Sequence, residues 1–266
     1  MPATLHDGRF ARTQRLLGEA GMARLTNAFV CIVGLGAVGS YAIEALARAG
    51  VGKLRLVDFD EIRLSNINRQ LYATSSTIGR KKCDVARQRV LDINPNCHVQ
   101  TLEVFVHTDT IEQVLAGDPK PPDLVIDAID SFTPKQILLE ALHLRGIPVI
   151  SSMGAAMRAD PLQIRIGPLA EVHTCPLAAK LRKALRKRGV PINFTCVYST
   201  EPVLQLPDDS ADLEAPQDEQ SLERGRKRRT LGSLPTLTGI FGLIAANAAI
   251  DQLAGLPKHS DQSPTR

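Results

Sequence analysis

The sequence predicts an α/β protein whose mainly parallel sheet has helices on both faces. A continuous apolar run at 28–33 leads into a glycine turn, Gly34-Leu35-Gly36-Ala37-Val38-Gly39, and a helix of small residues follows. A second strand at 53–58 then ends at an acid, and strands and helices keep alternating up to Ser152. A strand, a glycine turn, a helix and a second strand in this order are typical of a Rossmann-like fold. The continued alternation favours a parallel sheet.

The first half of the chain contains further elements of this kind. They are predicted as a helix at 40–49, a strand at 53–58, a helix at 80–91, strands at 99–106 and 123–128, a helix at 134–144 and a strand at 147–152. Gly50 and Gly52 end the first helix, and Asn94-Pro95 ends the helix at 80–91, because glycine and proline interrupt helices.

The pattern after Ser152 is less regular and predicts that further strands extend the sheet. Strands are expected at 163–166 and 195–199, and Pro176 opens a basic helix at 177–188, since proline is favoured at a first helical position. The polar stretch 207–219 has too little apolar surface to offset the entropy of ordering, and it predicts a mobile loop. The apolar stretch 234–253 contains polar residues and is interpreted as a buried helix, because a membrane span needs about twenty predominantly apolar residues.

Length and composition favour one soluble domain of 266 residues. We divide it into an N-terminal helical segment (1–27), a nucleotide-binding half (28–152), a substrate-side half (153–254) with a mobile loop at 207–230, and a flexible tail (255–266). The N-terminus lacks the apolar segment of a signal peptide, so a cytoplasmic location without a membrane partner is expected. The five cysteines include no CxxC pair, which argues against a disulfide framework and against a four-cysteine zinc site.

The glycine turn and the acid after the second strand form a candidate nucleotide site. Gly34 permits the tight turn, Gly36 lets the backbone approach a phosphate, and Gly39 lets the helix pack on the strand. Asp58 is placed to accept hydrogen bonds from ribose hydroxyls. A glycine turn without a ligand and a surface or capping acid are the alternatives.

A second group of polar residues suits a triphosphate better than a redox cofactor. Arg69 offers a planar fork of donors to phosphate oxygens, and Asn66 adds a neutral donor nearby. Lys82 can neutralise charge that develops during phosphate transfer. Asp127 and Asp130 end a strand where ligands of α/β proteins bind, and this suits Mg²⁺ held together with phosphates. An ordinary polar loop, a solvated lysine and a cap of the helix near Pro134 remain open alternatives.

The sequence resembles the ubiquitin-activating-enzyme-like superfamily, whose members adenylate carboxylates. This resemblance rests on the motifs CIVGLGAVGS, LVDFDEIRLSNINRQ, GRKKCDVA, INPNC and VIDAIDS. Within the superfamily the chain is most similar to the bacterial tRNA threonylcarbamoyladenosine dehydratases, through RLLGEAGMARL, DPLQIRIGPLA, CPLAAKLRKALRKRG and VYSTE. The similarity runs from about Arg9 to the last helix.

This resemblance implies an ATP-dependent dehydration that cyclises threonylcarbamoyladenosine next to the tRNA anticodon, through adenylation of the threonyl carboxylate. It implies that Asp58 holds the ribose, and that Asn66, Arg69 and Lys82 contact the phosphates. Asp130 would act on the metal and the transition state. The implied cofactors are ATP and Mg²⁺.

The superfamily also implies a homodimer in which Arg12 reaches into the site of the partner subunit. The paired CxxC zinc ligands of sulfur-carrier-activating relatives are missing, so zinc is not expected. Cys175 precedes a helix opened by Pro176, where a thiolate is favoured, but ring closure needs no thioester and we expect no essential role for it. Cys31 and Cys196 are interpreted as core residues.

Two basic segments are compatible with an RNA substrate. Lysines and arginines crowd the helix at 177–188, and a second basic run follows at 224–229, so salt-sensitive attraction to phosphates is expected. A solvated helix face is the alternative.

Other functions remain open beside the tRNA-modifying ligase. They are an adenylating activator of a ubiquitin-like sulfur-carrier protein, a non-catalytic nucleotide-binding adaptor in a sulfur relay, and a nicotinamide dehydrogenase. A cysteine desulfurase or a sulfur-acceptor protein is a further candidate partner.

Overall fold

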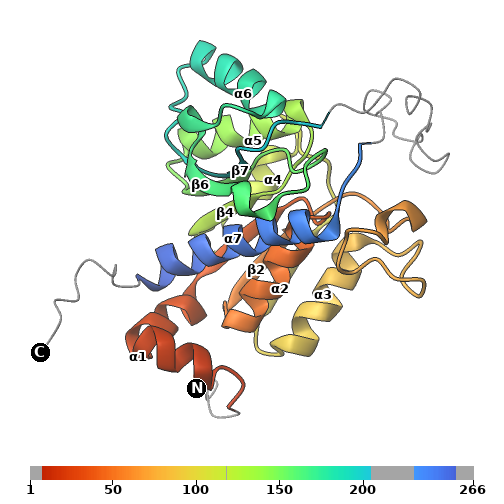
Figure 1. Cartoon of the computed structure of the whole chain (residues 1–266). Helices are drawn as coiled ribbons and strands as arrows, with labels where there is room; N and C mark the ends of the chain where they lie inside the picture. The colour runs from red at the N-terminus through yellow and green to blue at the C-terminus, as the bar shows by residue number, and fades with distance from the viewer. Residues whose placement is uncertain (1–7, 118, 205–230, 256–266) are drawn as a thin grey trace, which may run out of the picture.

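The computed structural model describes residues 8–117, 119–204 and 231–255. Its strands are β1 (Phe29–Val33), β2 (Lys53–Val57), β3 (His98–Leu102), β4 (Leu124–Asp127), β5 (Val149–Ser152), β6 (Ile164–Pro168) and β7 (Thr195–Ser199). They form one sheet in the order β3-β2-β1-β4-β5-β7-β6 (Figure 1). All neighbouring strands run parallel except β6, which pairs antiparallel with β7 at the edge. The predicted mainly parallel sheet, extended by C-terminal strands, is confirmed.

Helices cover both faces of this sheet. They are α1 (Ala11–Asn27), α2 (Gly39–Ala49), α3 (Lys82–Ile93), α4 (Ile111–Leu115), α5 (Phe132–Leu144), α6 (Pro176–Lys187) and α7 (Pro235–Ala254). Three short 3₁₀ helices, η1 (Leu64–Asn66), η2 (Pro161–Gln163) and η3 (Leu169–Glu171), lie in the connections.

The side chains of β1 alternate between two cores, as the period of a strand requires. Val30 and Ile32 belong to a cluster shared with α2, α3 and α7, whereas Cys31 and Val33 belong to a cluster shared with α4 and α5. A third cluster joins α6 to β7 and contains Cys196. Cys31 and Cys196 are therefore core residues, as predicted, and burial raises the pKa of the Cys31 thiol to about 12.

The last described helix, α7, packs closely against α2. A Cβ atom added at Gly242 would lie 2.3 Å from the carbonyl oxygen of Val38, and one added at Gly239 would lie 3.1 Å from the ring of Tyr41. By length and composition alone α7 is also apolar enough to cross a membrane, but half of that stretch is buried inside the structure. Its close packing identifies α7 as a core helix.

The boundaries of the predicted strands and helices lie within two residues of the observed ones, except at the end of β3, and two of the differences have clear causes. The strand predicted at 99–106 ends at Leu102, because its partner β2 ends at Val57, opposite Leu102, and the pairing closes with the Asp58 amide donating to the Leu102 carbonyl. The helix predicted at 80–91 begins at Lys82 instead, because Lys81 is extended and forms an isolated bridge with Glu61. The loop predicted at 207–230 lies outside the described residues, as does the tail predicted at 255–266 except for Gly255.

Candidate nucleotide site

The carboxyl ends of three parallel strands form the candidate site. Val33 of β1 is in register with Val57 of β2 on one side and with Asp127 of β4 on the other. From β1 the chain first adds β2 and β3 on one side, and it then crosses to β4 on the other side of β1. Ligands of open α/β sheets bind at such a switch point in the strand order. The glycine turn, Asp58 and the loop after Asp127 all follow these strand ends.

The three glycines of the turn have different structural reasons. Gly34 has a φ of +92°, and a Cβ atom there would lie 2.8 Å from the carbonyl oxygen of Ala128. A Cβ atom at Gly39 would lie 1.8 Å from the carbonyl oxygen of Gly34. At Gly36 the nearest neighbour is the Gln70 side-chain nitrogen at 3.7 Å, so the fold itself leaves space for a side chain. Gly36 therefore keeps open the approach to the amino end of α2, which no side chain caps.

Asp58 is held beside the turn by backbone donors. Its Oδ2 accepts a hydrogen bond from the Leu35 amide at 2.7 Å, and its Oδ1 accepts one from the Asp60 amide at 2.9 Å. Burial raises the pKa of the Asp58 carboxyl and outweighs the opposing effect of the nearby Lys82 ammonium. The carboxylate is thus fixed at the position expected for the ribose acid of this fold.

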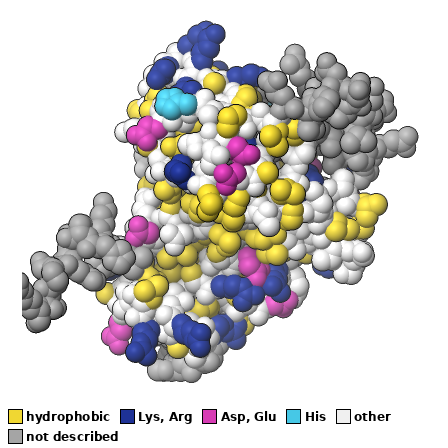
Figure 2. All heavy atoms as spheres, viewed as in Figure 1, with side chains coloured by type: hydrophobic (Ala, Val, Ile, Leu, Met, Phe, Trp, Pro, Cys, Tyr) yellow, Lys and Arg dark blue, Asp and Glu magenta, His cyan; other side chains and the backbone are white. Residues whose placement is uncertain are grey.

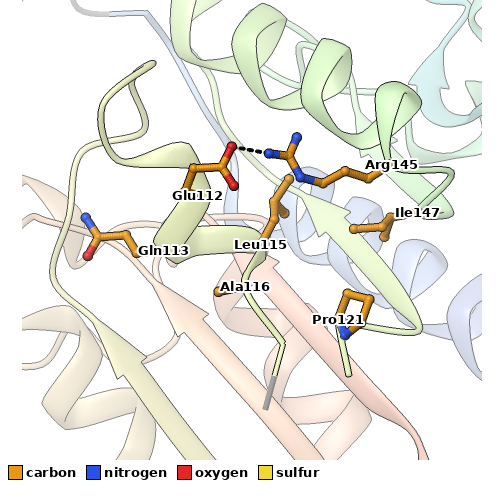
Figure 3. A pocket seen from close by; sticks show the side chains of 7 residues that line it. All are labelled: Glu112, Gln113, Leu115, Ala116, Pro121, Arg145 and Ile147. Carbon is orange, nitrogen blue, oxygen red and sulfur yellow. Dashed lines mark hydrogen bonds and ion pairs between the residues drawn. The ribbon is translucent and has the colours of Figure 1, made fainter. Parts of the chain in front are cut away.

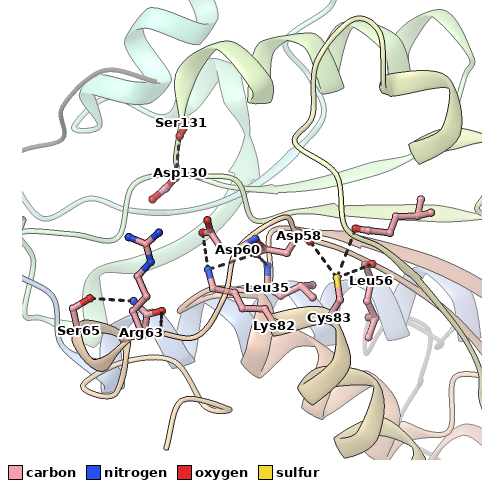
Figure 4. A network of polar contacts seen from close by, with 12 residues as sticks. Leu35, Leu56, Asp58, Asp60, Arg63, Ser65, Lys82, Cys83, Asp130 and Ser131 are labelled. Carbon is pink, nitrogen blue, oxygen red and sulfur yellow. Dashed lines mark hydrogen bonds and ion pairs between the residues drawn. The ribbon is translucent and has the colours of Figure 1, made fainter. Parts of the chain in front are cut away.

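Lys82 lies in the same network, at the start of α3 (Figure 4). Its Nζ is 2.9 Å from Oδ2 of Asp60 and 3.8 Å from Oδ2 of Asp58. Burial opposes the charged form of Lys82, but the carboxylates of Asp58 and Asp60 outweigh it and raise the pKa of this ammonium. Lys82 is therefore a buried cation, not the solvated lysine of the alternative interpretation.

Asn66 ends η1 and Arg69 lies in the turn that follows, next to Gln70, whose side-chain nitrogen is the nearest neighbour of Gly36. Asn66 is 6% exposed, and its Oδ1 accepts the Arg63 amide, while its Nδ2 has only a 3.5 Å contact with Ser65. Arg69 donates from one guanidinium nitrogen to the Ser65 carbonyl and to Asn68 Oδ1, both at 2.8 Å. These contacts orient the guanidinium without pairing it to an acid.

The two acids after β4 lie in different surroundings. Asp127 is fully buried, its Oδ2 lies 2.7 Å from Nζ of Lys135, and the same oxygen accepts a hydrogen bond from Ser151 at 2.6 Å. Asp130 is exposed and lies across the site from Lys82 and Asp60 (Figure 4). Asp127 therefore stabilises the fold through its contacts with Lys135 and Ser151, whereas Asp130 is the acid of this pair that faces the site.

Sequence reasoning missed two further residues of the site. Asp60 is the principal ion-pair partner of Lys82. Arg63 extends its guanidinium towards Asp130 (Figure 4), and that guanidinium forms no hydrogen bond or ion pair within the described part of the chain. A single arginine in a loop gives no sequence signal, whereas the second acid of Asp58-Phe59-Asp60 was visible and had no evident role.

Cys175 is buried and caps α6. Its Sγ accepts hydrogen bonds from the amides of Gly154 at 3.4 Å and Ala178 at 3.5 Å. The thiol thus serves as a helix cap, and this geometry gives it a structural function that requires no chemistry.

A separate hollow of about 570 Å³ lies at the other edge of the sheet. Its lining consists of Glu112, Gln113, Leu115, Ala116, Pro121, Arg145 and Ile147 (Figure 3). Pro121 and Ile147 precede β4 and β5, so this hollow faces the amino ends of the strands. Arg145 is already paired with Glu112, and the candidate nucleotide site lies at the opposite, carboxyl ends of the strands.

A doubly wound sheet with a glycine turn at its switch point, and with a buried acid and a buried lysine beside that turn, is the arrangement of a nucleotide-binding protein. The chain belongs to the ThiF family, whose model matches residues 10–265.

Relatives of known name extend over nearly the whole chain. It is 37% identical to a tRNA threonylcarbamoyladenosine dehydratase of Bacillus subtilis, over 88% of this chain and 91% of that protein. The crystal structure of the Escherichia coli tRNA N6-threonylcarbamoyladenosine dehydratase in complex with AMP superposes with a TM-score of 0.80, at 34% identity, covering 93% and 94% of the two chains. The same enzyme in complex with ATP gives 0.79. An adenylyltransferase and sulfurtransferase of Drosophila virilis is 32% identical but matches 59% of this chain and 35% of its own length.

Proposed function

We propose that this chain catalyses the ATP-dependent dehydration of threonylcarbamoyladenosine next to the tRNA anticodon. The observation that carries this proposal is the buried arrangement of Asp58, Asp60 and Lys82 beside the glycine turn. It is supported by relatives of that name that cover 88% and 92% of this chain.

The threonyl carboxylate is a poor electrophile, so the reaction must first activate it. An oxygen of the threonyl carboxylate attacks the α-phosphorus of ATP, and pyrophosphate leaves, so the carboxylate becomes an acyl adenylate. A carbamoyl group of the same modified base then attacks the acyl carbon, loses a proton, and AMP leaves as the ring closes. The oxygen of the lost water departs on AMP, which explains why a dehydration consumes ATP.

The side chains of the site have separate parts in this scheme. Asp58 accepts hydrogen bonds from the ribose, while Gly36 and the first amides of α2 receive phosphate oxygens. Asn66, Arg69 and Lys82 neutralise the charge that grows on the phosphates in the transition state. Asp127 acts indirectly, because it fixes the loop that carries Asp130.

Magnesium fits the residues that are present. Mg²⁺ in nucleotide sites usually takes one or two carboxylates together with phosphate oxygens, and the exposed carboxylate of Asp130 faces the site. When bound, the ion would neutralise phosphate charge. No cluster of three metal-binding side chains occurs among the described residues, so a metal held by protein alone is not part of the proposal.

The test is a reaction of the purified protein with ATP, Mg²⁺ and tRNA that bears threonylcarbamoyladenosine. The expected result is a nucleoside whose mass is lower by one water, with AMP and pyrophosphate formed in equal amounts. An unchanged nucleoside mass together with normal ATP binding would contradict the proposal. A non-catalytic nucleotide-binding adaptor would give this contradicting result, namely ATP binding with an unchanged nucleoside mass. It also predicts that an Arg69→Ala variant keeps its biological activity.

A second candidate function is the activation of a ubiquitin-like sulfur carrier. It is favoured by similarity to an adenylyltransferase and sulfurtransferase, although this covers only part of both chains. This function predicts exchange of pyrophosphate into ATP only when a carrier protein is added. Exchange with modified tRNA alone would reject it. A cysteine desulfurase or a sulfur-acceptor protein remains a proposed partner under either function.

We further propose that the protein forms a homodimer. We also propose that it is cytoplasmic and has no membrane partner. Exposed leucines surround the start of α7, and Figure 2 shows hydrophobic side chains gathered over this region. They are Leu162, Leu204, Leu231, Leu234 and Leu243. Arg12 lies on α1, which packs near Gly50 and Gly52 at the far end of α2, so it would reach a nucleotide site only in a partner. Sedimentation of the wild type and a Leu162→Glu variant tests the dimer.

A further inference from the structure

The outward face of α6 carries charge that the protein leaves without an opposite partner. Lys180, Lys183, Arg186 and Lys187 are exposed, and none of them has a hydrogen bond or ion pair within the described part of the chain. The helix contains no acid that would neutralise them. Figure 2 shows the corresponding cluster of basic side chains at the end of the molecule where Figure 1 places α6.

Other basic side chains differ in this respect. Arg48 and Arg89 share the carboxylate of Glu44, and each lies 2.7 to 2.8 Å from it. On α6 itself, Arg182 donates to the carbonyl of Val172, and Arg188 is paired with Glu140. These arginines stabilise the fold, whereas the four outward cations of α6 are free to act on a ligand.

The opposite face of α6 is committed to the core. Ala178, Leu181 and Leu185 are fully buried against β7 and its neighbours. A basic amphipathic helix binds a membrane by inserting its apolar face, and α6 has no apolar face left to insert. Its charged face is therefore suited to a polyanion that stays in water.

The position of α6 relates this face to the nucleotide site. Thr174, just before the helix, donates from its hydroxyl to the carbonyl of Ser199 at 2.7 Å, and Ser199 is the last residue of β7. Since β7 runs parallel to β5 and hence to β1, α6 begins at the sheet edge that carries the glycine turn. Lys180 is the cation nearest to that edge, and Lys183, Arg186 and Lys187 follow it along the helix away from the edge. A macromolecule that presents one nucleotide to the site and is long enough to follow α6 can therefore meet all four cations.

The spacing of the cations matches a nucleic acid backbone. Lys180, Lys183 and Lys187 lie on one side of the helix, and the seven steps from the first to the last span about 10 Å at a rise of about 1.5 Å per residue. Successive phosphates of one strand advance by about 3.4 Å along a duplex axis, so this row can meet two or three of them.

We propose that the outward face of α6 binds the phosphate backbone of the tRNA substrate and holds it while the modified nucleotide occupies the site. This inference rests on the proposed function, because that function supplies the RNA. Phosphate contacts of this kind fix orientation and carry no base specificity. Recognition of the modified base must then come from the site itself.

The experiment measures binding of the full chain to purified tRNA that bears threonylcarbamoyladenosine, over a series of salt concentrations. A Lys183→Gln/Lys187→Gln variant should reduce the slope of log K against log salt by about two, since each phosphate contact contributes about one. Its affinity at low salt should fall roughly 10- to 100-fold. Two controls accompany it: Lys183→Arg/Lys187→Arg, which keeps the charge, and Arg15→Gln/Arg87→Gln, which removes two exposed charges elsewhere.

The proposal requires that the arginine pair binds like the wild type and that the Arg15/Arg87 pair keeps the wild-type slope. It is overturned if the Lys183/Lys187 glutamine pair keeps that slope, or if both glutamine pairs lose it equally, since net charge alone would then explain the effect. If the Lys183→Gln/Lys187→Gln variant keeps the wild-type affinity for tRNA but no longer binds vesicles of anionic lipid, the face binds a membrane and the proposal is overturned. Failure of the proposed function has a different signature, namely wild-type protein that yields no cyclised nucleoside whatever its salt slope.

Discussion

Nζ of Lys135 lies 2.7 Å from Oδ2 of Asp127, and both side chains are completely buried. The same ammonium donates to the carbonyl of Ile129 at 2.9 Å, and Asp127 Oδ1 accepts the Ile129 amide at 3.1 Å. The peptide of Ala128 and Ile129 lies directly against Gly34. The buried pair thus fixes the loop that both supports the nucleotide turn and carries Asp130.

Removal of one partner of this pair should be costly. A Lys135→Met variant leaves the Asp127 charge buried without compensation, and the expected loss is about 3–5 kcal/mol of the free energy of unfolding. Urea denaturation of Lys135→Met, Asp127→Asn and the double variant gives the coupling between the two residues. The double variant should recover much of the loss, and strictly additive losses would contradict the assignment.

Two glycines of the turn should behave oppositely. Gly36→Ala should fold with an unchanged melting temperature, because its nearest neighbour is 3.7 Å away, yet its ATP affinity should fall because the methyl group occupies the phosphate approach. Gly34→Ala should lose about 1–3 kcal/mol of stability, since its φ is +92° and Ala128 blocks the methyl group. Calorimetric titration with ATP and thermal unfolding measure both effects. Equal ATP affinity of Gly36→Ala and the wild type would remove Gly36 from the site.

Arg69 should matter for turnover more than for folding. The Arg69→Ala variant is expected to lose roughly 10²- to 10³-fold in single-turnover rate, as when a donor to a transition-state charge is removed. Its unfolding curve should match the wild type, because within the described part of the chain the Arg69 side chain hydrogen-bonds to Ser65 and Asn68 alone. Arg80→Ala, an exposed arginine of the same segment, is the matched control and should keep the full rate.

Arg63 should contribute to nucleotide binding. Its guanidinium extends into the site (Figure 4), so Arg63→Gln is expected to weaken ATP more than AMP, because the extra phosphates of ATP lose a cation. Binding of both nucleotides by fluorescence titration measures this ratio. Equal weakening of ATP and AMP would place Arg63 at the nucleoside end instead.

The Cys175→Ser variant should remain active. A serine hydroxyl replaces the thiol as an acceptor for the first amides of α6, and no nucleophile is needed for ring closure. The cyclised nucleoside from wild type and variant can be compared at equal protein concentration. Near-complete loss of product, with the fold retained, would indicate that a thioester forms during the reaction.

Much of the architecture was predictable because alternating apolar runs and glycine turns are local signals. The glycine turn and Asp58 were assigned from their places after strands, and Lys82 from its place at the start of a helix; the parallel register then brings the strand ends to one edge. The Lys135–Asp127 pair was not predictable, because spacing along the chain does not show which way a helical lysine points. Nor did Arg63 give a signal, since its place depends on the path of a loop. The end of β3 depended on the length of a neighbouring strand, which the residues of β3 do not encode.

The packing of α7 against α2 has a consequence for how the chain folds during its synthesis. Phe241 and Ala245 complete the core beneath the helix that follows the glycine turn, yet they are among the last described residues of the chain. During synthesis on a ribosome, the first two hundred residues emerge with that core still open. We therefore expect the core beneath the glycine turn to close only after α7 has left the ribosome, so that nucleotide binding follows the synthesis of α7.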